Sequence, residues 1–192
     1  MSTLSLDPRT TALVLIDLQK GIAARQTAPH AAAEVIARAA KLADRFRDRR
    51  SPVVLVRVAY SADGGDRLQQ PVDAQPWSGA PAPDFSELVP AVGPKDGDLV
   101  VTKRNWGAFY GTDLDLHLRR RGVRTIVLGG IATNFGVEST ARDAWERNYA
   151  LVLVEDAMSA MAAEAHQFAV QNIFPRLGLV RSTDDVLRAL KA

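Results

Sequence analysis

Four short apolar runs, separated by segments with helical periodicity, constrain the fold of this 192-residue chain more than any other feature. The runs begin at Ala12, Val53, Thr125 and Leu151, and each is continuously apolar instead of alternating with polar residues. Continuous runs of this length are typical of strands that are buried on both faces, as in a parallel sheet. Their alternation with helical segments predicts an α/β fold with helices on both faces of the sheet.

The same patterns predict where each element lies. Helices are expected at 31–49 and 112–121, from about 134, and at 160–174, just before Pro175. The second helix has Thr112 and Asp115 as a possible capping box and ends at Gly122. No repeat or change of composition divides the chain, so a single domain spanning 1–192 is expected. The expected strands are 11–17, 53–59, 98–102, 125–129, 150–154 and 179–181.

Composition excludes several classes of function. The formal net charge is only +2, so no strong field favours nucleic acid or a membrane surface as a partner. The chain has no cysteine, which excludes disulfides, thiolate metal sites and cysteine-based catalysis. No apolar stretch approaches the ~20 residues of a membrane span. The N-terminus lacks the pattern of a signal peptide, so a cytoplasmic protein is expected.

The segment 61–97 has little periodicity and is rich in proline. Long structureless segments are uncommon in compact domains and are often lids or binding loops. A solvated connection is the other interpretation, and Trp77 favours the lid because a lone tryptophan in a polar loop needs a surface to cover. The segment holds six of the ten prolines, namely Pro71, Pro76, Pro81, Pro83, Pro90 and Pro94.

Two charged residues stand at the carboxyl ends of predicted strands. Asp17 closes the first strand and Lys103 follows the third, whereas Lys95 and Asp98 are expected to be ordinary surface charges. Ligands of open α/β sheets bind beyond the carboxyl ends of the strands, so Asp17 could act there with a pKa raised by its apolar neighbours. A lysine nearby could keep the carboxylate ionised or bind an anionic substrate. Taken alone, Asp17 could equally cap the next helix.

A third feature is the glycine-rich junction 129–142, which joins a buried strand to a helix. Such a junction presents backbone N–H groups that suit a carboxylate or an oxyanion. It matches neither the GxGxxG pattern of dinucleotide sites nor the GxSxG pattern of serine hydrolases. Ser139 and Thr140 are expected to be structural. The three histidines, His30, His117 and His166, are far apart and show no ligand spacing, so a catalytic metal site is not expected.

Together these features resemble the isochorismatase-like hydrolases over nearly the whole chain. The resemblance rests on Leu13-Val14-Leu15-Ile16-Asp17-Leu18-Gln19, on Lys103 followed by Trp106-Gly107-Ala108-Phe109, and on Gly130-Ile131-Ala132-Thr133-Asn134 with Val137 and Thr140-Ala141-Arg142. It implies a three-layer α/β/α fold with a six-stranded parallel sheet of order 3-2-1-4-5-6. It also implies a small-molecule substrate and a homo-oligomer, either a dimer or a tetramer.

The amidases of that family use an aspartate, a lysine and a cysteine. By motif the first two correspond to Asp17 and Lys103, whereas the cysteine position is occupied by Gly136. The backbone N–H groups of Ala132 and Gly136 fall at the family's oxyanion positions, and a cis peptide is expected at Ile131–Ala132. The Asp-x-His metal motif of the nicotinamidases is missing after the second strand, so no cofactor or metal is implied.

True isochorismatases are similar in having glycine at the nucleophile position. They cleave a vinyl ether and release pyruvate, with an acid that protonates the enol carbon and a water that captures the oxocarbenium ion. In this chain Asp17 would be the acid and Lys103 its partner, and Gly136 would leave space for the substrate ring. The chain differs from those enzymes by Ala132 in place of a tyrosine and Tyr60 in place of a glutamine. The other substrate-binding candidates are Thr133, Phe109 and Trp77.

Two other functions stay open at this point. The chain could hydrolyse a different small amide or enol ether with a water that Asp17 activates. It could also be a ligand-binding relic that lost catalysis together with its nucleophile. The presence of both Asp17 and Lys103 favours an enzyme, because a relic has no chemical need for the pair.

Overall fold

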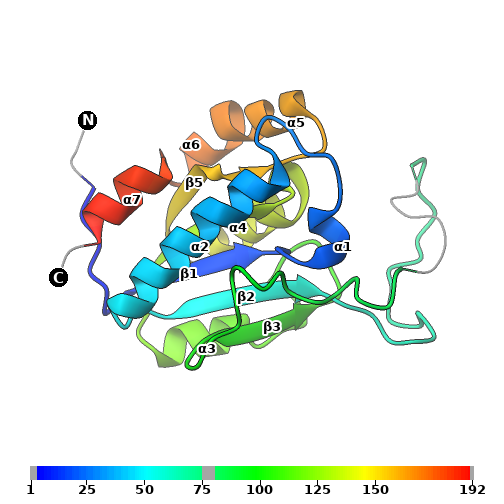
Figure 1. Cartoon of the computed structure of the whole chain (residues 1–192), viewed down its shortest axis with the longest axis horizontal. Helices are drawn as coiled ribbons and strands as arrows, with labels where there is room; N and C mark the ends of the chain where they lie inside the picture. Colours follow the sequence, from blue (N-terminus) through cyan, green and yellow to red (C-terminus); the bar gives the residue numbers. More distant parts are fainter. Residues whose placement is uncertain (1–3, 75–80, 191–192) are drawn as a thin grey trace.

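The computed structural model describes residues 4–74 and 81–190, which form a six-stranded parallel sheet between two layers of helices (Figure 1). The strand order is β3-β2-β1-β4-β5-β6, as the resemblance implied, so the expected fold class is confirmed. Each paired strand runs parallel to its neighbour, with β1 between β2 and β4 at the centre. The strands are β1 (Thr11–Ile16), β2 (Val53–Val58), β3 (Leu99–Lys103), β4 (Thr125–Ile131), β5 (Ala150–Ser159) and β6 (Leu179–Arg181).

Helices cover both faces of this sheet. In β1, Leu13 and Leu15 pack into the core beneath α2 and α7, whereas Val14 and Ile16 pack into the core beneath α3, α4 and α6. Because both faces are covered, every position of β1 is buried, which explains its continuous apolar run. The helices are α1 (Lys20–Ala23), α2 (Ala32–Asp48), α3 (Leu114–Arg120), α4 (Glu138–Glu146), α5 (Ala163–Phe168), α6 (Phe174–Leu177) and α7 (Thr183–Ala189), with π-helical turns η1 (Thr133–Val137) and η2 (Ala169–Ile173). Within the described residues, none of these helices is long and apolar enough to cross a membrane.

Several element boundaries differ from the sequence prediction. The predicted strand 150–154 is longer, because β5 continues to Ser159 past an irregularity in its pairing with β4 between Leu128 and Gly130. The predicted helix 160–174 is divided into α5, η2 and α6, and it does not stop before Pro175. Proline is tolerated there because it lies in the first turn of α6, where its missing N–H group has no partner to lose.

The expected capping box of the second helix is wrong. The N-cap of α3 is Asp113, and the Thr112 hydroxyl instead accepts a hydrogen bond from the Leu114 N–H at 3.2 Å. Asp115 accepts a hydrogen bond from the Tyr149 hydroxyl at 2.8 Å, so its carboxylate ties α3 to the start of β5. The capping box that the structure contains is Ser182 with Asp185 at the start of α7, a helix that periodicity did not reveal.

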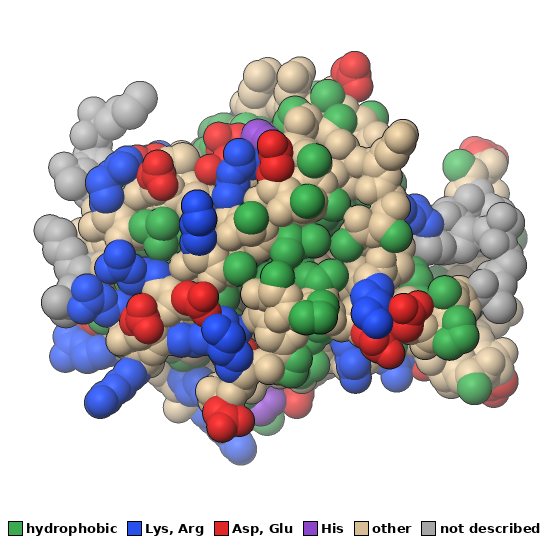
Figure 2. Space-filling view, viewed as in Figure 1, with side chains coloured by type: hydrophobic (Ala, Val, Ile, Leu, Met, Phe, Trp, Pro, Cys, Tyr) green, Lys and Arg blue, Asp and Glu red, His purple; other side chains and the backbone are tan. Residues whose placement is uncertain are grey.

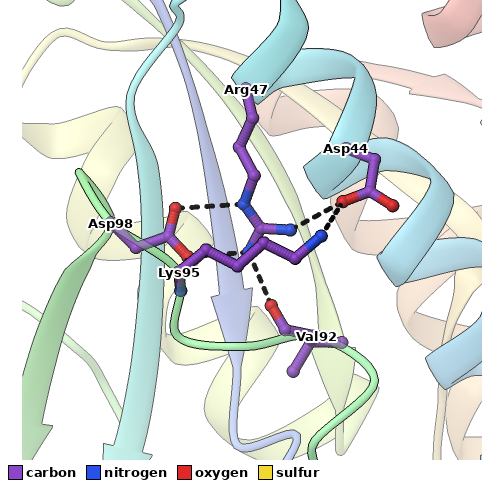
Figure 3. A network of polar contacts seen from close by, with 5 residues as sticks. All are labelled: Asp44, Arg47, Val92, Lys95 and Asp98. Carbon is purple, nitrogen blue, oxygen red and sulfur yellow. Dashed lines mark hydrogen bonds and ion pairs between the residues drawn. The ribbon is translucent and has the colours of Figure 1, made fainter.

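Asp98 is not the surface charge that the sequence suggested. Its side chain is only 2% exposed and accepts a hydrogen bond from Arg47 Nη2 at 2.7 Å. The same guanidinium donates to the Val92 carbonyl at 2.6 Å and to Asp44 at 2.9 Å (Figure 3). This network fixes α2 against the loop that precedes β3, while Lys95 stays at the surface and reaches Asp44 at 2.7 Å.

Candidate active site

Asp17 and Lys103 meet above the carboxyl ends of the central strands. Asp17 directly follows β1, adopts a positive φ of 55° and donates its backbone N–H to the Val56 carbonyl of β2 at 2.8 Å. Lys103 is the last residue of β3, and its Nζ lies 2.8 Å from Asp17 Oδ2 and 3.0 Å from the Asn105 carbonyl. The lysine therefore reaches across the end of β2 to form a buried ion pair with the aspartate.

Neighbouring residues hold the Asp17 turn in place. The Gln19 side chain is fully buried and bridges two backbone segments: its amide donates to the Val58 and Phe85 carbonyls at 3.0 and 2.9 Å and accepts from the Val58 N–H at 2.8 Å. On the other side, Gly130 of β4 has a φ of 129°, and a Cβ there would overlap the backbone of Ile16. Only glycine permits this close approach, so β4 packs directly against the end of β1.

Burial controls the protonation of this pair. The side chains of Asp17 and Lys103 are 8% and 2% exposed. Loss of solvation raises the pKa of Asp17 to about 6, against the opposing effect of the Lys103 charge. Asp17 Oδ1 is buried and has no hydrogen-bond partner among the described residues. The carboxyl group is thus able to carry a proton near neutral pH, and one of its oxygens has no hydrogen-bond partner among the described residues.

Gly136 lies directly beside Asp17. It belongs to η1, which begins after the Ile131–Ala132 peptide, and that peptide is cis as the resemblance implied. A Cβ at position 136 would lie 2.9 Å from Asp17 Oδ2 and 2.9 Å from Ile16 Cγ2. The three positions that the sequence singled out, Asp17, Lys103 and Gly136, therefore lie together. Position 136, where the family's amidases have their cysteine, faces Asp17 but has no side chain.

Thr140 connects η1 to the segment that follows Lys103 through two hydrogen bonds. Its hydroxyl donates to the Gly136 carbonyl at 2.6 Å and accepts a hydrogen bond from the Ala108 N–H at 3.2 Å. The side chain is fully buried. The expectation that Thr140 is structural is confirmed, and its role is to position the backbone around Gly136.

A cavity of about 200 Å³ opens above the pair. Its lining combines two cations and one carboxylate with aromatic and aliphatic side chains, and it contains no histidine among the described residues. Such a mixture suits a small molecule that carries a negative charge and an apolar part. The lining includes Asp17, Lys103, Arg25, Asn105, Tyr60, Trp106, Phe135, Met161, Ala132 and Gly136.

The structure brings together only some of the predicted site residues. Ala132 lines the cavity, but Thr133 and Phe109 do not. Thr133 is fully buried and its hydroxyl pairs with His166 Nδ1 at 2.9 Å. Phe109 is also buried, beneath the Arg147 guanidinium, so neither is placed to contact a substrate in the cavity. Trp77 lies outside the described residues.

Sequence reasoning missed part of the cavity wall. Trp106 and Phe135 form an edge-to-face pair with ring centroids 4.8 Å apart, and both are exposed at the rim. These two residues could have been found from the sequence, because Trp106 lies shortly after Lys103 and Phe135 lies directly before Gly136. Arg25 and Met161 lie in segments without any motif, and only the fold brings them to the cavity.

A larger cavity, of about 480 Å³, lies at the opposite edge of the sheet beside Pro52 and Val53 at the start of β2. Arginines dominate its lining, and Figure 2 shows lysine and arginine side chains gathered toward that end of the molecule. Two of its charged residues, Arg47 and Asp98, are already paired in the network described above. The buried Asp17–Lys103 pair lies in the smaller cavity, which is therefore the candidate active site.

The fold and this site together define a three-layer α/β protein with a buried acid–lysine pair beneath a cavity at the carboxyl ends of its strands. Residues 11–185 match the isochorismatase domain. The chain is 52% identical over 187 residues to the isochorismatase family protein YecD of Escherichia coli O157:H7. The alignment covers 97% of this chain and the whole of YecD. The chain belongs to the isochorismatase family, whose members are hydrolases.

Two further comparisons place it within that family. An isochorismatase family protein from Burkholderia thailandensis has a closely similar structure, with a TM-score of 0.94, 48% identity and complete coverage of both chains. The ureidoacrylate amidohydrolase RutB of Methylobacterium radiotolerans is 33% identical over 206 aligned positions, which cover 92% of this chain and 78% of that protein. The family thus includes at least one relative named for amide hydrolysis.

Proposed function

We propose that this protein hydrolyses a small vinyl ether of the isochorismate type by acid catalysis, with Asp17 as the acid and Lys103 as its partner. The observation that carries the proposal is the glycine at the convergence point. A Cβ at position 136 would lie 2.9 Å from Asp17 Oδ2. The position at which the resemblance implies a nucleophile therefore has no side chain and lies next to a protonatable carboxyl group. Vinyl-ether hydrolysis is a reaction that needs an acid and a water but no nucleophilic side chain.

The chemistry runs in three steps. Protonated Asp17 donates its proton to the terminal enol carbon, which leaves an oxocarbenium ion and an aspartate that Lys103 stabilises at 2.8 Å. Water adds to the oxocarbenium carbon and loses a proton, which restores the acid and gives a hemiketal. The hemiketal C–O bond then breaks, and the products are a ketone and an alcohol. No covalent bond to the protein forms at any step.

The charges around the cavity support an anionic substrate. Arg25 and Lys103 both line it, against Asp17 as the only carboxylate among the described lining residues. A guanidinium forms two parallel hydrogen bonds with a carboxylate, so Arg25 is suited to hold the enolpyruvyl carboxylate of such a substrate. The aromatic pair Trp106 and Phe135 offers an apolar rim for a ring.

A second candidate function is hydrolysis of a small amide by a water that Asp17 activates. The similarity to RutB, which is named a ureidoacrylate amidohydrolase, favours it. In this reaction the carboxylate form of Asp17 would take a proton from water, and the oxyanion would need N–H donors such as those of Ala132 and Gly136. The two functions therefore require opposite protonation states of the same residue.

The deciding experiment is a mass-spectrometric screen of the purified protein against chorismate, isochorismate and a panel of small amides that includes ureidoacrylate. We expect pyruvate release from a vinyl ether and no ammonia or carbamate release from the amides. Turnover of an amide without any turnover of the vinyl ethers would replace the first proposal by the second.

The pH profile provides a separate prediction. The acid mechanism requires protonated Asp17, and burial raises the pKa of this group to about 6. We expect kcat/KM to be level below pH 6 and to fall ~tenfold per pH unit once the carboxyl is ionised. Enzyme returned to pH 6 after each measurement should regain full activity. A rise of kcat/KM through pH 6 would instead identify Asp17 as a base.

Thiol reagents provide another prediction. Because the chain has no cysteine, iodoacetamide should leave turnover unchanged, and intact-mass spectra taken during turnover should show only the unmodified protein mass. A substrate-sized mass increase that disappears when substrate is exhausted would reveal a covalent intermediate and contradict the mechanism above.

A further inference from the structure

The fold brings together three metal-ligand side chains that are distant in the sequence. His30, Glu155 and His166 each offer one ligand atom, and these atoms all lie within 4.8 Å of one another. His30 Nε2 is 3.7 Å from Glu155 Oε2, and the two imidazole rings meet edge to face with centroids 5.8 Å apart. The wide spacing of the histidines along the chain had suggested that no such group exists.

Two local features of the fold create this cluster. The irregular register of β5 against β4 falls between Leu128 and Gly130, and Glu155 lies in the part of β5 where the pairing shifts. The loop that carries His30 is attached to the end of the same strand. Ala28 and Ala160 exchange two backbone hydrogen bonds at 2.8 and 3.1 Å, and the Ser159 hydroxyl donates to the His30 carbonyl at 2.8 Å.

The buried member of the cluster is prepared as a ligand. His166 is only 3% exposed, and its Nδ1 is held by the Thr133 hydroxyl at 2.9 Å, which fixes the ring orientation. A metal-binding histidine usually has its other ring nitrogen hydrogen-bonded in this way, because the second contact orients the ring toward the ion.

Glu155 is the carboxylate of the cluster, because the adjacent Asp156 is engaged elsewhere. The next residue, Asp156, accepts hydrogen bonds from the Thr183 N–H and hydroxyl at 2.7 and 2.9 Å, which ties it to the start of α7. The Glu155 side chain is 38% exposed and that of His30 is 22% exposed, so an ion has a path from solvent.

We propose that His30, Glu155 and His166 form a binding site for a divalent transition-metal ion of the zinc type. Two imidazoles and one carboxylate are a ligand set that such ions favour, and three protein ligands leave a coordination position for water or an anion. Ligands at ~2.1 Å from a tetrahedral ion are ~3.4 Å apart. The cluster must contract to reach this spacing, and His30 and Glu155 are the partly exposed side chains that can move.

This site is separate from the catalytic pair. None of its three residues lines the cavity above Asp17, and the hydrolysis proposed above needs no metal. The bound ion would instead join the His30 loop, β5 and α5. The consequence to measure is therefore metal binding and thermal stability, which do not depend on the identity of the substrate.

The test uses the full chain with any histidine tag removed, stripped with a chelator and gel-filtered. Zn²⁺ is titrated in competition with a chromophoric chelator, for the native protein and for the variants His30→Gln, Glu155→Gln and His117→Gln. The last is the matched control, because His117 lies on α3 beside Asp113, outside the cluster. Melting temperatures with and without Zn²⁺ check that every variant is folded.

We expect the native protein and His117→Gln to bind one equivalent and to melt at a higher temperature with Zn²⁺. Loss of an outer partner of a metal ligand already weakens binding ~10–100-fold, so His30→Gln and Glu155→Gln should each weaken it by at least ~tenfold. Equal affinity in all four proteins, or no binding by the native protein at micromolar Zn²⁺, would overturn the proposal.

Discussion

Asp17→Asn is expected to lower turnover by ~10²–10⁴, the usual cost of removing one acid–base group. Asparagine keeps the shape of the side chain and a hydrogen-bond acceptor for Lys103 Nζ, which lies 2.8 Å from Asp17 Oδ2. It removes the exchangeable proton and the negative charge of the ionised form. The measurement is kcat under saturating substrate, and Asp48→Asn, at an exposed position at the end of α2, is the matched control with unchanged activity.

Stability separates a lost catalytic group from a damaged fold. Burial raises the pKa of Asp17 from 3.8 to about 6, so the stability that its neutral form contributes is fully present below pH 4 and is lost as the pH rises through 6. The carboxylate itself is thus not a strong stabilising group at pH 8. Asp17→Asn does leave Lys103 without its counter-ion, but Lys103 keeps the Asn105 carbonyl at 3.0 Å. The loss should stay below the ~3–5 kcal/mol of a broken buried pair.

Lys103→Met should complete the argument through the pH profile. Lys103 lowers the pKa of Asp17 against the effect of burial, so its removal raises that pKa further. The fall of any residual kcat/KM should therefore move to higher pH in this variant. Near-normal turnover in Asp17→Asn, or an unshifted profile in Lys103→Met, would contradict the assignment of this pair as the catalytic unit.

The sequence predicted the sheet well because burial leaves a direct mark on composition. Every residue of β1 is buried, so the strand is apolar from Ala12 to Ile16. The convergence of Asp17, Lys103 and Gly136 was also predictable, because the carboxyl ends of neighbouring parallel strands share one edge of the sheet.

Contacts between residues that are distant in the sequence could not be predicted in this way, because they produce no local sequence pattern. Asp98 looks like any surface carboxylate in the sequence, and only the fold places Arg47 against it at 2.7 Å. His30 and His166 are also far apart along the chain, and the irregular end of β5 brings both next to Glu155. Thr133 is one of the predicted substrate-binding residues and lies next to Ala132 in the sequence, yet its hydroxyl faces His166. Adjacency in a motif does not determine which side of the backbone a side chain occupies.

Gly136→Cys is expected to turn this site into a reactive thiol site and to abolish its native activity. A Cβ there would lie 2.9 Å from Asp17 Oδ2 and from Ile16 Cγ2, so both neighbours must shift to make room for it. Overpacking of this kind costs ~1–3 kcal/mol, which a folded domain of this size tolerates. The new sulfur would then stand beside the acid and occupy the space that the glycine leaves to a substrate.

The thiol should be unusually nucleophilic. Asp17 can accept its proton, the Lys103 ammonium favours the thiolate, and the N–H groups at the start of a helix lower the pKa of a thiol further. Because the chain has no other cysteine, labelling by iodoacetamide reports this one position. Ala91→Cys, at an exposed loop residue, supplies the reference rate for an ordinary thiol.

We expect Gly136→Cys to react at least ~tenfold faster than Ala91→Cys at pH 7, and the double variant with Lys103→Met to lose most of that gain. Native turnover should be lost in Gly136→Cys and retained in Ala91→Cys. A thiol at 136 that reacts no faster than the reference would mean that Asp17 and Lys103 do not act on this position. Unchanged native turnover would mean that the substrate does not bind above Gly136, and either result would remove the basis for a reaction without a nucleophile at this site.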